Sequence, residues 1–80
     1  MKQKKAVKRK YYGSTMASVT EFGGKYFVEG YYYADNDDDT GVLMPGLKPC
    51  TDMEEAMLIF DGLNSYQDVV RFVENTRANE

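Results

Sequence analysis

The side chains of this sequence that could do chemistry are carboxylates, aromatic rings and a group of cations. The 80 residues include no histidine and one cysteine, Cys50. Histidine-based catalytic triads, histidine metal sites and an internal disulfide are therefore excluded. We interpret Cys50 as a small, partly buried apolar residue, because Lys48 alone does not make a reactive thiol environment. With no nucleophile–base pair of the usual kind, the sequence predicts a protein that is not an enzyme.

The densest group of carboxylates lies in residues 35–41, Asp-Asn-Asp-Asp-Asp-Thr-Gly. Turn formers with nothing apolar among them predict a surface loop. An EF-hand calcium loop that began at Asp35 would need glycine and glutamate where Thr40 and Gly46 stand. We therefore interpret the run as an acidic loop that faces solvent or a partner. Weak calcium binding stays open as an alternative, and we expect no cofactor.

The charges are divided unequally along the chain. Residues 11–80 carry all thirteen acidic residues against four basic ones, a net charge of −9. Residues 1–10 hold no acid and six bases: Lys2, Lys4, Lys5, Lys8, Arg9 and Lys10. We expect residues 1–10 to be a basic flexible tail or the start of the first strand, and residues 11–80 to be a single domain. The basic run either keeps the chain solvated or contacts the phosphates of nucleic acid.

The chain has 4 phenylalanines and 7 tyrosines, and residues 22–34 hold six of these eleven rings. This segment follows the strand-like residues 15–22, and Gly23-Gly24 between them predicts a two-residue hairpin loop. The loop sets a register in which Phe22 faces Lys25 and Met16 faces Tyr31. A large aromatic content in one strand is more than one face of a small core can absorb, which favours a binding role.

Alternation along this hairpin sorts the side chains onto two faces of a sheet. The first face holds small or apolar residues: Thr15, Ala17, Val19, Tyr26, Val28, Gly30 and Tyr32. The second holds Met16, Phe22, Phe27, Tyr31 and Tyr33, with polar residues between them. Because Ala17 and Gly30 face each other without bulk, we expect the helices to pack on the first face. A slip of one residue would reverse this assignment.

The remaining elements follow from turn and cap signals. We expect one long first strand over residues 6–21 with a bulge or bend at Gly13, and a short strand over 41–44 ended by Pro45-Gly46. A capping box from Thr51 to Glu54 begins a helix that ends at Gly62. Its apolar stripe is Met53, Ala56, Met57 and Phe60. A second helix begins after Asn64 or Ser65 and buries Tyr66, Val69, Val70, Phe72 and Val73.

The predicted fold class is α+β. It is a two-layer β-β-β-α-α arrangement, in which a helical hairpin packs on one face of a three-stranded antiparallel sheet. No apolar run approaches the roughly 18 residues of a membrane span. The basic first residues lack the apolar segment of a signal peptide, and we expect a cytoplasmic protein.

For function, the acidic body and the surplus of aromatic rings predict a small protein-binding domain. Carboxylates steer a protein towards basic surfaces, and aromatic anchors carry interface energy. The expected binding residues are Asp35, Asp37, Asp38, Asp39, Phe27, Tyr31, Tyr33, Glu54 and Glu55. A basic surface in a cell is often a nucleic-acid channel, so the prediction is an inhibitor that mimics nucleic acid. Phage-encoded anti-defence proteins of the anti-CRISPR type resemble this chain in size and composition.

The alternative function is binding of single-stranded nucleic acid. It would use the six cations of residues 1–10 together with the tyrosine-rich sheet, because bases stack on exposed aromatic rings. The net charge of −9 over residues 11–80 opposes it. No membrane partner is expected, and the oligomeric state stays open.

Overall fold

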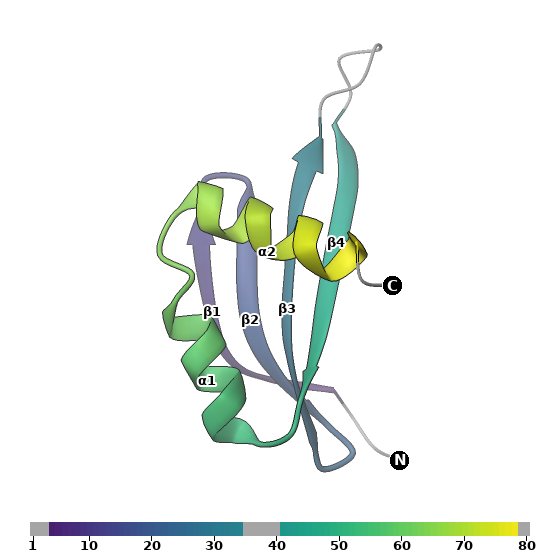
Figure 1. Cartoon of the computed structure of the whole chain (residues 1–80), viewed down its shortest axis with the longest axis vertical. Helices are drawn as coiled ribbons and strands as arrows, with labels where there is room; N and C mark the ends of the chain where they lie inside the picture. Colours follow the sequence, from purple (N-terminus) through teal and green to yellow (C-terminus); the bar gives the residue numbers. More distant parts are fainter. Residues whose placement is uncertain (1–3, 35–40, 79–80) are drawn as a thin grey trace.

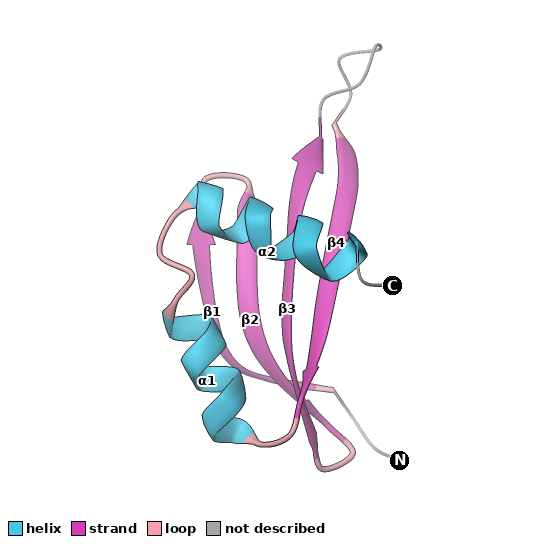
Figure 2. Ribbon diagram, viewed as in Figure 1, coloured by secondary structure: helices cyan, strands magenta, loops and turns pink. Residues whose placement is uncertain are grey.

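The computed structural model describes residues 4–34 and 41–78. In these residues four strands precede two helices, and Figure 1 shows both helices on the same face of the sheet. The elements are β1 (Lys5–Tyr12), β2 (Thr15–Phe22), β3 (Lys25–Ala34), β4 (Val42–Cys50), α1 (Met53–Asp61) and α2 (Tyr66–Ala78). The strands are antiparallel in the order β1-β2-β3-β4 (Figure 2). The domain is therefore a two-layer α+β structure with one face of its sheet open.

The α+β class with an antiparallel sheet and two helices is confirmed, but the prediction of three strands is wrong. The segment expected as one strand over residues 6–21 is the hairpin of β1 and β2. Gly13 has φ of 63° and belongs to the tight turn between them. A glycine with positive φ reverses the chain in a two-residue loop, whereas we had expected it to bend one strand. The observed bulge lies elsewhere, between Ala6 and Lys8.

The last strand is longer than the sequence predicted. β4 continues through Pro45 and Gly46 to Cys50, where the prediction ended it at residue 44. Pro45 pairs with Tyr31 and Pro49 pairs with Phe27. β4 is an edge strand, and at an edge the nitrogens that point away from the neighbouring strand need no N–H. Alternate residues of a strand direct their backbone nitrogens to the same side. Because Pro45 and Pro49 are four residues apart, both nitrogens point away from β3.

The predicted register of β2 and β3 is confirmed from Phe22 opposite Lys25 to Met16 opposite Tyr31. The helices also pack on the expected face. Ala17, Val19 and Val28 are fully buried beneath them. α1 contributes Ala56 and Phe60 to this core, and α2 contributes Val69, Phe72 and Val73. Leu63, in the segment between the helices, completes it. The helix-facing side of the sheet and the helices therefore build the hydrophobic core together, and neither α1 nor α2 covers the opposite face of the sheet.

Two glycines let α2 lie close to the sheet. A Cβ on Gly30 would stand 3.5 Å from side-chain atoms of both Val69 and Phe72. A Cβ on Gly46 would stand 3.0 Å from the Cα of Val73 and closer still to Oγ1 of Thr76. The close approach that the Ala17–Gly30 pair predicted is thus made by α2.

We expect Gly46→Ala to lower the free energy of unfolding by about 1–3 kcal/mol, because the added methyl group overpacks a backbone contact. Chemical denaturation measures this change. Gly62→Ala is the matched control. Its φ is −83° and its nearest neighbour would be 3.4 Å away, so its stability should stay close to that of the parent. Equal losses in both variants would contradict the close packing of α2 on β4.

Candidate functional site

The face of the sheet opposite the helices is mostly apolar. Cross-strand pairing places ten apolar side chains on it: Tyr11, Met16, Phe22, Phe27, Tyr31, Tyr33, Leu43, Pro45, Leu47 and Pro49. We call this set the open face. Exposure reaches 61% for Tyr11 and 51% for Leu43, and Phe22, Tyr33 and Leu47 are exposed as well. Several exposed apolar side chains on one face mark an interaction site more often than a single exposed residue does.

Phe27, Tyr31 and Tyr33, which the sequence predicted as binding residues, lie together on the open face. They occupy alternate positions of β3, so their side chains point to the same side. The rings of Tyr31 and Tyr33 meet edge to face, with centroids 5.8 Å apart and an interplanar angle of 76°. Phe27 and Tyr31 are half-buried and Tyr33 is exposed. The sequence missed Leu47, because the predicted strand ended at residue 44. Leu43 lies within the predicted strand but was not named as a binding residue.

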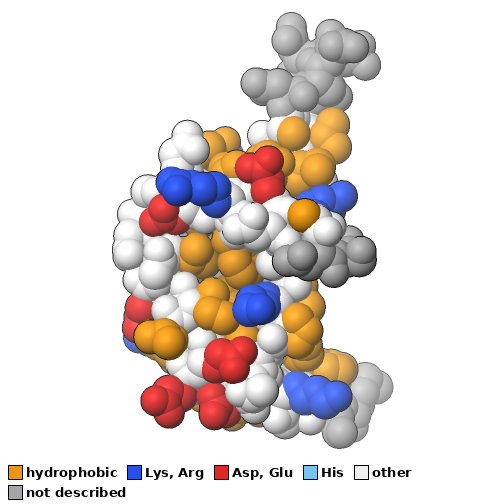
Figure 3. Space-filling model, viewed as in Figure 1, with side chains coloured by type: hydrophobic (Ala, Val, Ile, Leu, Met, Phe, Trp, Pro, Cys, Tyr) orange, Lys and Arg blue, Asp and Glu red, His pale blue; other side chains and the backbone are white. Residues whose placement is uncertain are grey.

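Glu54 and Glu55 lie in the first turn of α1, in the layer opposite Phe27, Tyr31 and Tyr33. The residue that caps α1 is Asp52, not Thr51 as predicted, and its Oδ1 accepts a hydrogen bond of 2.8 Å from the Glu55 N–H. Thr51 instead donates its hydroxyl to the Glu55 carboxylate. Figure 3 shows acidic side chains gathered around the end where α1 begins. A flat partner cannot contact these acids and the open face at the same time.

The predicted acidic residues of the loop, Asp35, Asp37, Asp38 and Asp39, lie outside the described residues. So does Lys2. The described charges on the open face are Arg9, Lys25 and Glu29, together with Lys4, which reaches it from the segment before β1. The described part of the open face therefore carries more basic than acidic side chains, whereas acidic side chains lie around α1.

A polar network crosses the open face between its apolar residues. Nζ of Lys4 lies 2.6 Å from Oε1 of Glu29, although Lys4 precedes β1 and Glu29 belongs to β3. The other Glu29 oxygen accepts from the Thr20 hydroxyl at 3.4 Å, and the Ser18 and Thr20 hydroxyls lie 3.4 Å apart. Ser18 and Thr20 are buried. The only sequence signal for this network is that Glu29 alternates with Phe27 and Tyr31.

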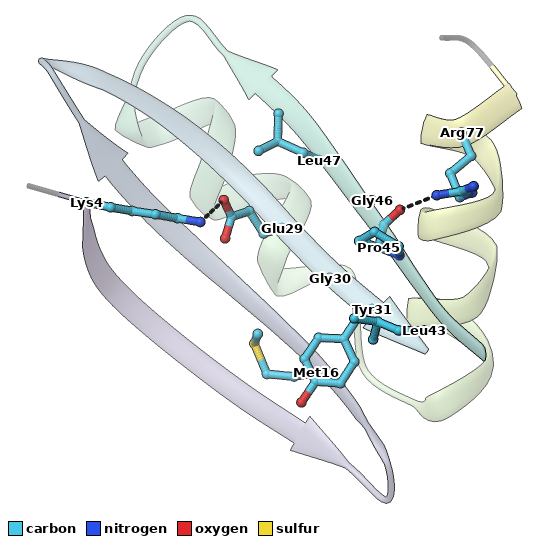
Figure 4. A pocket seen from close by; sticks show the side chains of 10 residues that line it. All are labelled: Lys4, Met16, Glu29, Gly30, Tyr31, Leu43, Pro45, Gly46, Leu47 and Arg77. Atoms are coloured by element: carbon cyan, nitrogen blue, oxygen red, sulfur yellow. Dashed lines mark hydrogen bonds and ion pairs between the residues drawn. The ribbon is translucent and has the colours of Figure 1, made fainter. Parts of the chain in front are cut away.

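Two hollows flank the Lys4–Glu29 ion pair. The first, of about 330 Å³, is walled mainly by Met16, Tyr31, Leu43, Pro45 and Leu47 (Figure 4). Arg77 of α2 reaches its rim around β4, and its Nη1 donates a hydrogen bond of 3.1 Å to the Pro45 carbonyl. The second hollow also has a volume of about 330 Å³, and its lining includes Arg9 and Tyr11.

The basic run of residues 4–10 belongs mostly to β1, an edge strand of the sheet. The bulge between Ala6 and Lys8 places Arg9 on the open face, opposite Ser18, and Lys8 and Lys10 on the helix side. Nζ of Lys10 lies 4.3 Å above the centre of the Phe60 ring, a cation–π contact. The cations therefore point to both sides of an exposed edge.

Cys50 is a half-buried free cysteine at the end of β4. Burial first, and then the nearby Glu55 carboxylate, raise the pKa of its thiol. A raised pKa keeps the thiol protonated at neutral pH, which fits the apolar role that the sequence indicated. Within residues 4–34 and 41–78 no three or more acidic, cysteine or histidine side chains gather as metal ligands. In the same residues neither helix has the length and apolar character to cross a membrane.

No protein-family model, curated protein or solved structure matches the chain.

Proposed function

We propose that the protein is a non-enzymatic binding domain that holds a partner protein on the open face of its sheet. The observation that carries this proposal is the exposure of Tyr11, Phe22, Tyr33, Leu43 and Leu47, between 45% and 61%, on the same face of the sheet. Exposed aromatic and aliphatic side chains that share one face are typical of the core of a protein–protein interface. The helices fill the other face, so the open face is available to a partner.

The narrower form of this proposal is an inhibitor that docks on a basic, nucleic-acid-binding surface, as phage-encoded anti-CRISPR proteins do. Its support comes from α1, where Asp52, Glu54, Glu55 and Asp61 lie and where the last turn holds no basic residue. Exposed carboxylates attract a basic partner and speed its association. The charges of the open face are mostly basic and suit an acidic or neutral contact. We therefore expect substitutions on α1 and substitutions on the open face to affect partner binding in separable ways.

A pull-down with variants of each layer tests the proposal. The tagged protein is incubated with lysate of the organism that encodes it, and captured proteins are identified by mass spectrometry. We expect Leu43→Ser with Leu47→Ser to lose the specific partner, because both side chains are exposed and belong to the apolar face. Glu54→Gln with Glu55→Gln is the matched pair on α1, and we expect it to retain the partner. The reverse pattern would contradict docking on the sheet and support docking through α1.

A second candidate function, binding of single-stranded nucleic acid, is favoured by one observation. β1 carries Lys5, Lys8, Arg9 and Lys10 along an exposed edge, beside the exposed ring of Tyr11. Lysine-rich edges also prevent sheets from pairing with one another, which is the competing explanation. Filter binding with oligothymidylate and oligouridylate of about 20 nucleotides at low salt separates the two. Saturable binding that Lys5→Gln with Lys8→Gln and Arg9→Gln abolishes would favour nucleic acid.

A further inference from the structure

The hollow over β3 and β4 is lined mainly by apolar side chains. Met16 and Tyr31 form its wall on one side, and Leu43, Pro45 and Leu47 form the other, as Figure 4 shows from the open side of the sheet. Gly30 and Gly46, which pair directly, line it with backbone atoms, because a side chain on either would point towards α2. A volume of about 330 Å³ is that of a small ligand pocket.

Two cations lie at the rim of this hollow, and they differ in what they contact. Lys4 is already neutralised by Glu29. Among residues 4–34 and 41–78 the ion pairs are Lys4–Glu29 and Arg71–Asp68, so no described carboxylate pairs with Arg77. The Pro45 carbonyl holds one nitrogen of the Arg77 guanidinium and so orients the group beside the hollow. The remaining N–H groups of a guanidinium suit a carboxylate, which accepts two parallel hydrogen bonds.

We propose that this hollow seats a large apolar side chain from an acidic segment of a partner protein, and that Arg77 binds a neighbouring carboxylate of that segment. This proposal rests on the proposed function in its general form, a domain that binds a partner on the open face, and not on the narrower inhibitor that docks on a basic surface. The expected binding segment of the partner is short and has an aliphatic or aromatic residue flanked by aspartate or glutamate.

The charges around the hollow and the apolar side chains of its walls favour this segment over a second copy of the chain and over a nucleic-acid base. A second copy of the chain, packed open face to open face, would bring Arg9 and Lys25 of both copies into one interface and repel itself. A nucleic-acid base would stack on aromatic faces, whereas Leu43, Pro45 and Leu47 form one side of this hollow. A segment with both an apolar side chain and a carboxylate matches the walls and the rim together.

The test is a titration of the isotope-labelled full chain with two synthetic peptides, followed by nuclear magnetic resonance. The probes are acetyl-Asp-Leu-Phe-Asp-amide and acetyl-Lys-Leu-Phe-Lys-amide, which differ only in the sign of their charges. We expect the acidic peptide to shift the amide signals of Gly30, Gly46 and Leu47 saturably. It should bind about threefold tighter than the basic peptide at low salt, and the ratio should fall towards one at high salt.

Two arginines of α2 provide a matched pair of variants. Arg77→Gln should remove the preference for the acidic peptide, while Arg71→Gln should leave it unchanged, because Arg71 pairs with Asp68 away from the hollow. Leu47→Ser should weaken both peptides. Equal binding of the two peptides, loss of preference in Arg71→Gln, or shifts that miss the hollow would each overturn the inference. If the pull-down partner binds through the open face but the acidic peptide shows no preference, the inference fails and the proposed function stands.

Discussion

Phe60→Ala is expected to lower the free energy of unfolding by about 3–5 kcal/mol, the usual cost of deleting a buried aromatic ring. Phe60 is 5% exposed and belongs to the core between α1 and the sheet. Nζ of Lys10, in β1, lies 4.3 Å from the centre of the Phe60 ring. The substitution therefore also removes a contact between the helix layer and the edge strand. A small domain has about 5–15 kcal/mol of total stability, so the loss should be plain in thermal and urea unfolding.

Leu58→Ala is the matched control on the same helix. Leu58 is 75% exposed, and its truncation should change the stability by less than about 0.5 kcal/mol. Phe60→Leu should lower the free energy of unfolding much less than Phe60→Ala does, because leucine keeps most of the buried volume. Coincident unfolding curves for Phe60→Ala and the parent would mean that the apolar stripe of α1 is not part of the core.

Tyr31→Ala is expected to shorten the lifetime of the complex with the partner protein by about 30-fold, with little change in the association rate. The factor corresponds to about 2 kcal/mol, the loss typical of an aromatic anchor at the centre of an interface. Tyr31 is half-buried, contacts Tyr33 edge to face and lines the apolar hollow, which is how an anchor is arranged. Surface plasmon resonance with the identified partner measures both rates.

Glu54→Gln with Glu55→Gln should show the opposite kinetic pattern. Exposed charges act at long range and are screened over about 8–10 Å at physiological salt, so they change association and its salt dependence. The lifetime of the complex should stay within about twofold. We expect the same of Asp35, Asp37, Asp38 and Asp39, which lie outside the described residues. An unchanged lifetime in a folded Tyr31→Ala variant would place the interface elsewhere than on the sheet.

The sequence by itself determined the central hairpin and its two faces. Gly23-Gly24 requires a two-residue turn, and the turn fixes the register of β2 and β3 by simple counting. Alternation then separates Val19 and Val28 from Phe27 and Tyr31 without knowledge of any distant contact. The helices were also predictable, because stripes such as Ala56 with Phe60 recur at the period of the helix itself. The prediction that Tyr66 is buried was wrong, since it is 39% exposed at the start of α2. These signals are local, so the neighbouring residues suffice to interpret them.

Strand number and strand length depended on the tertiary structure. A glycine such as Gly13 suits both a bulge and a hairpin turn, and only the partner of the preceding strand decides between them. Pro45 and Pro49 end a strand in the interior of a sheet but are tolerated at its edge. Whether a strand lies at an edge depends on the order of all the strands, which no local pattern records.

The sequence predicted the aromatic residues of the candidate site, but the tertiary structure decided which charged groups lie beside them. The sheet brings Lys4 to Glu29, and α2 crosses β4 so that Arg77 reaches the Pro45 carbonyl. The same topology puts the Glu54 and Glu55 carboxylates in the layer opposite Tyr31, although the sequence predicted all three as binding residues. Composition determines that a small chain has more aromatic side chains than its core can bury. Which charges lie beside them depends on long-range strand pairing and helix packing, because residues distant in the sequence become neighbours only when the layers assemble.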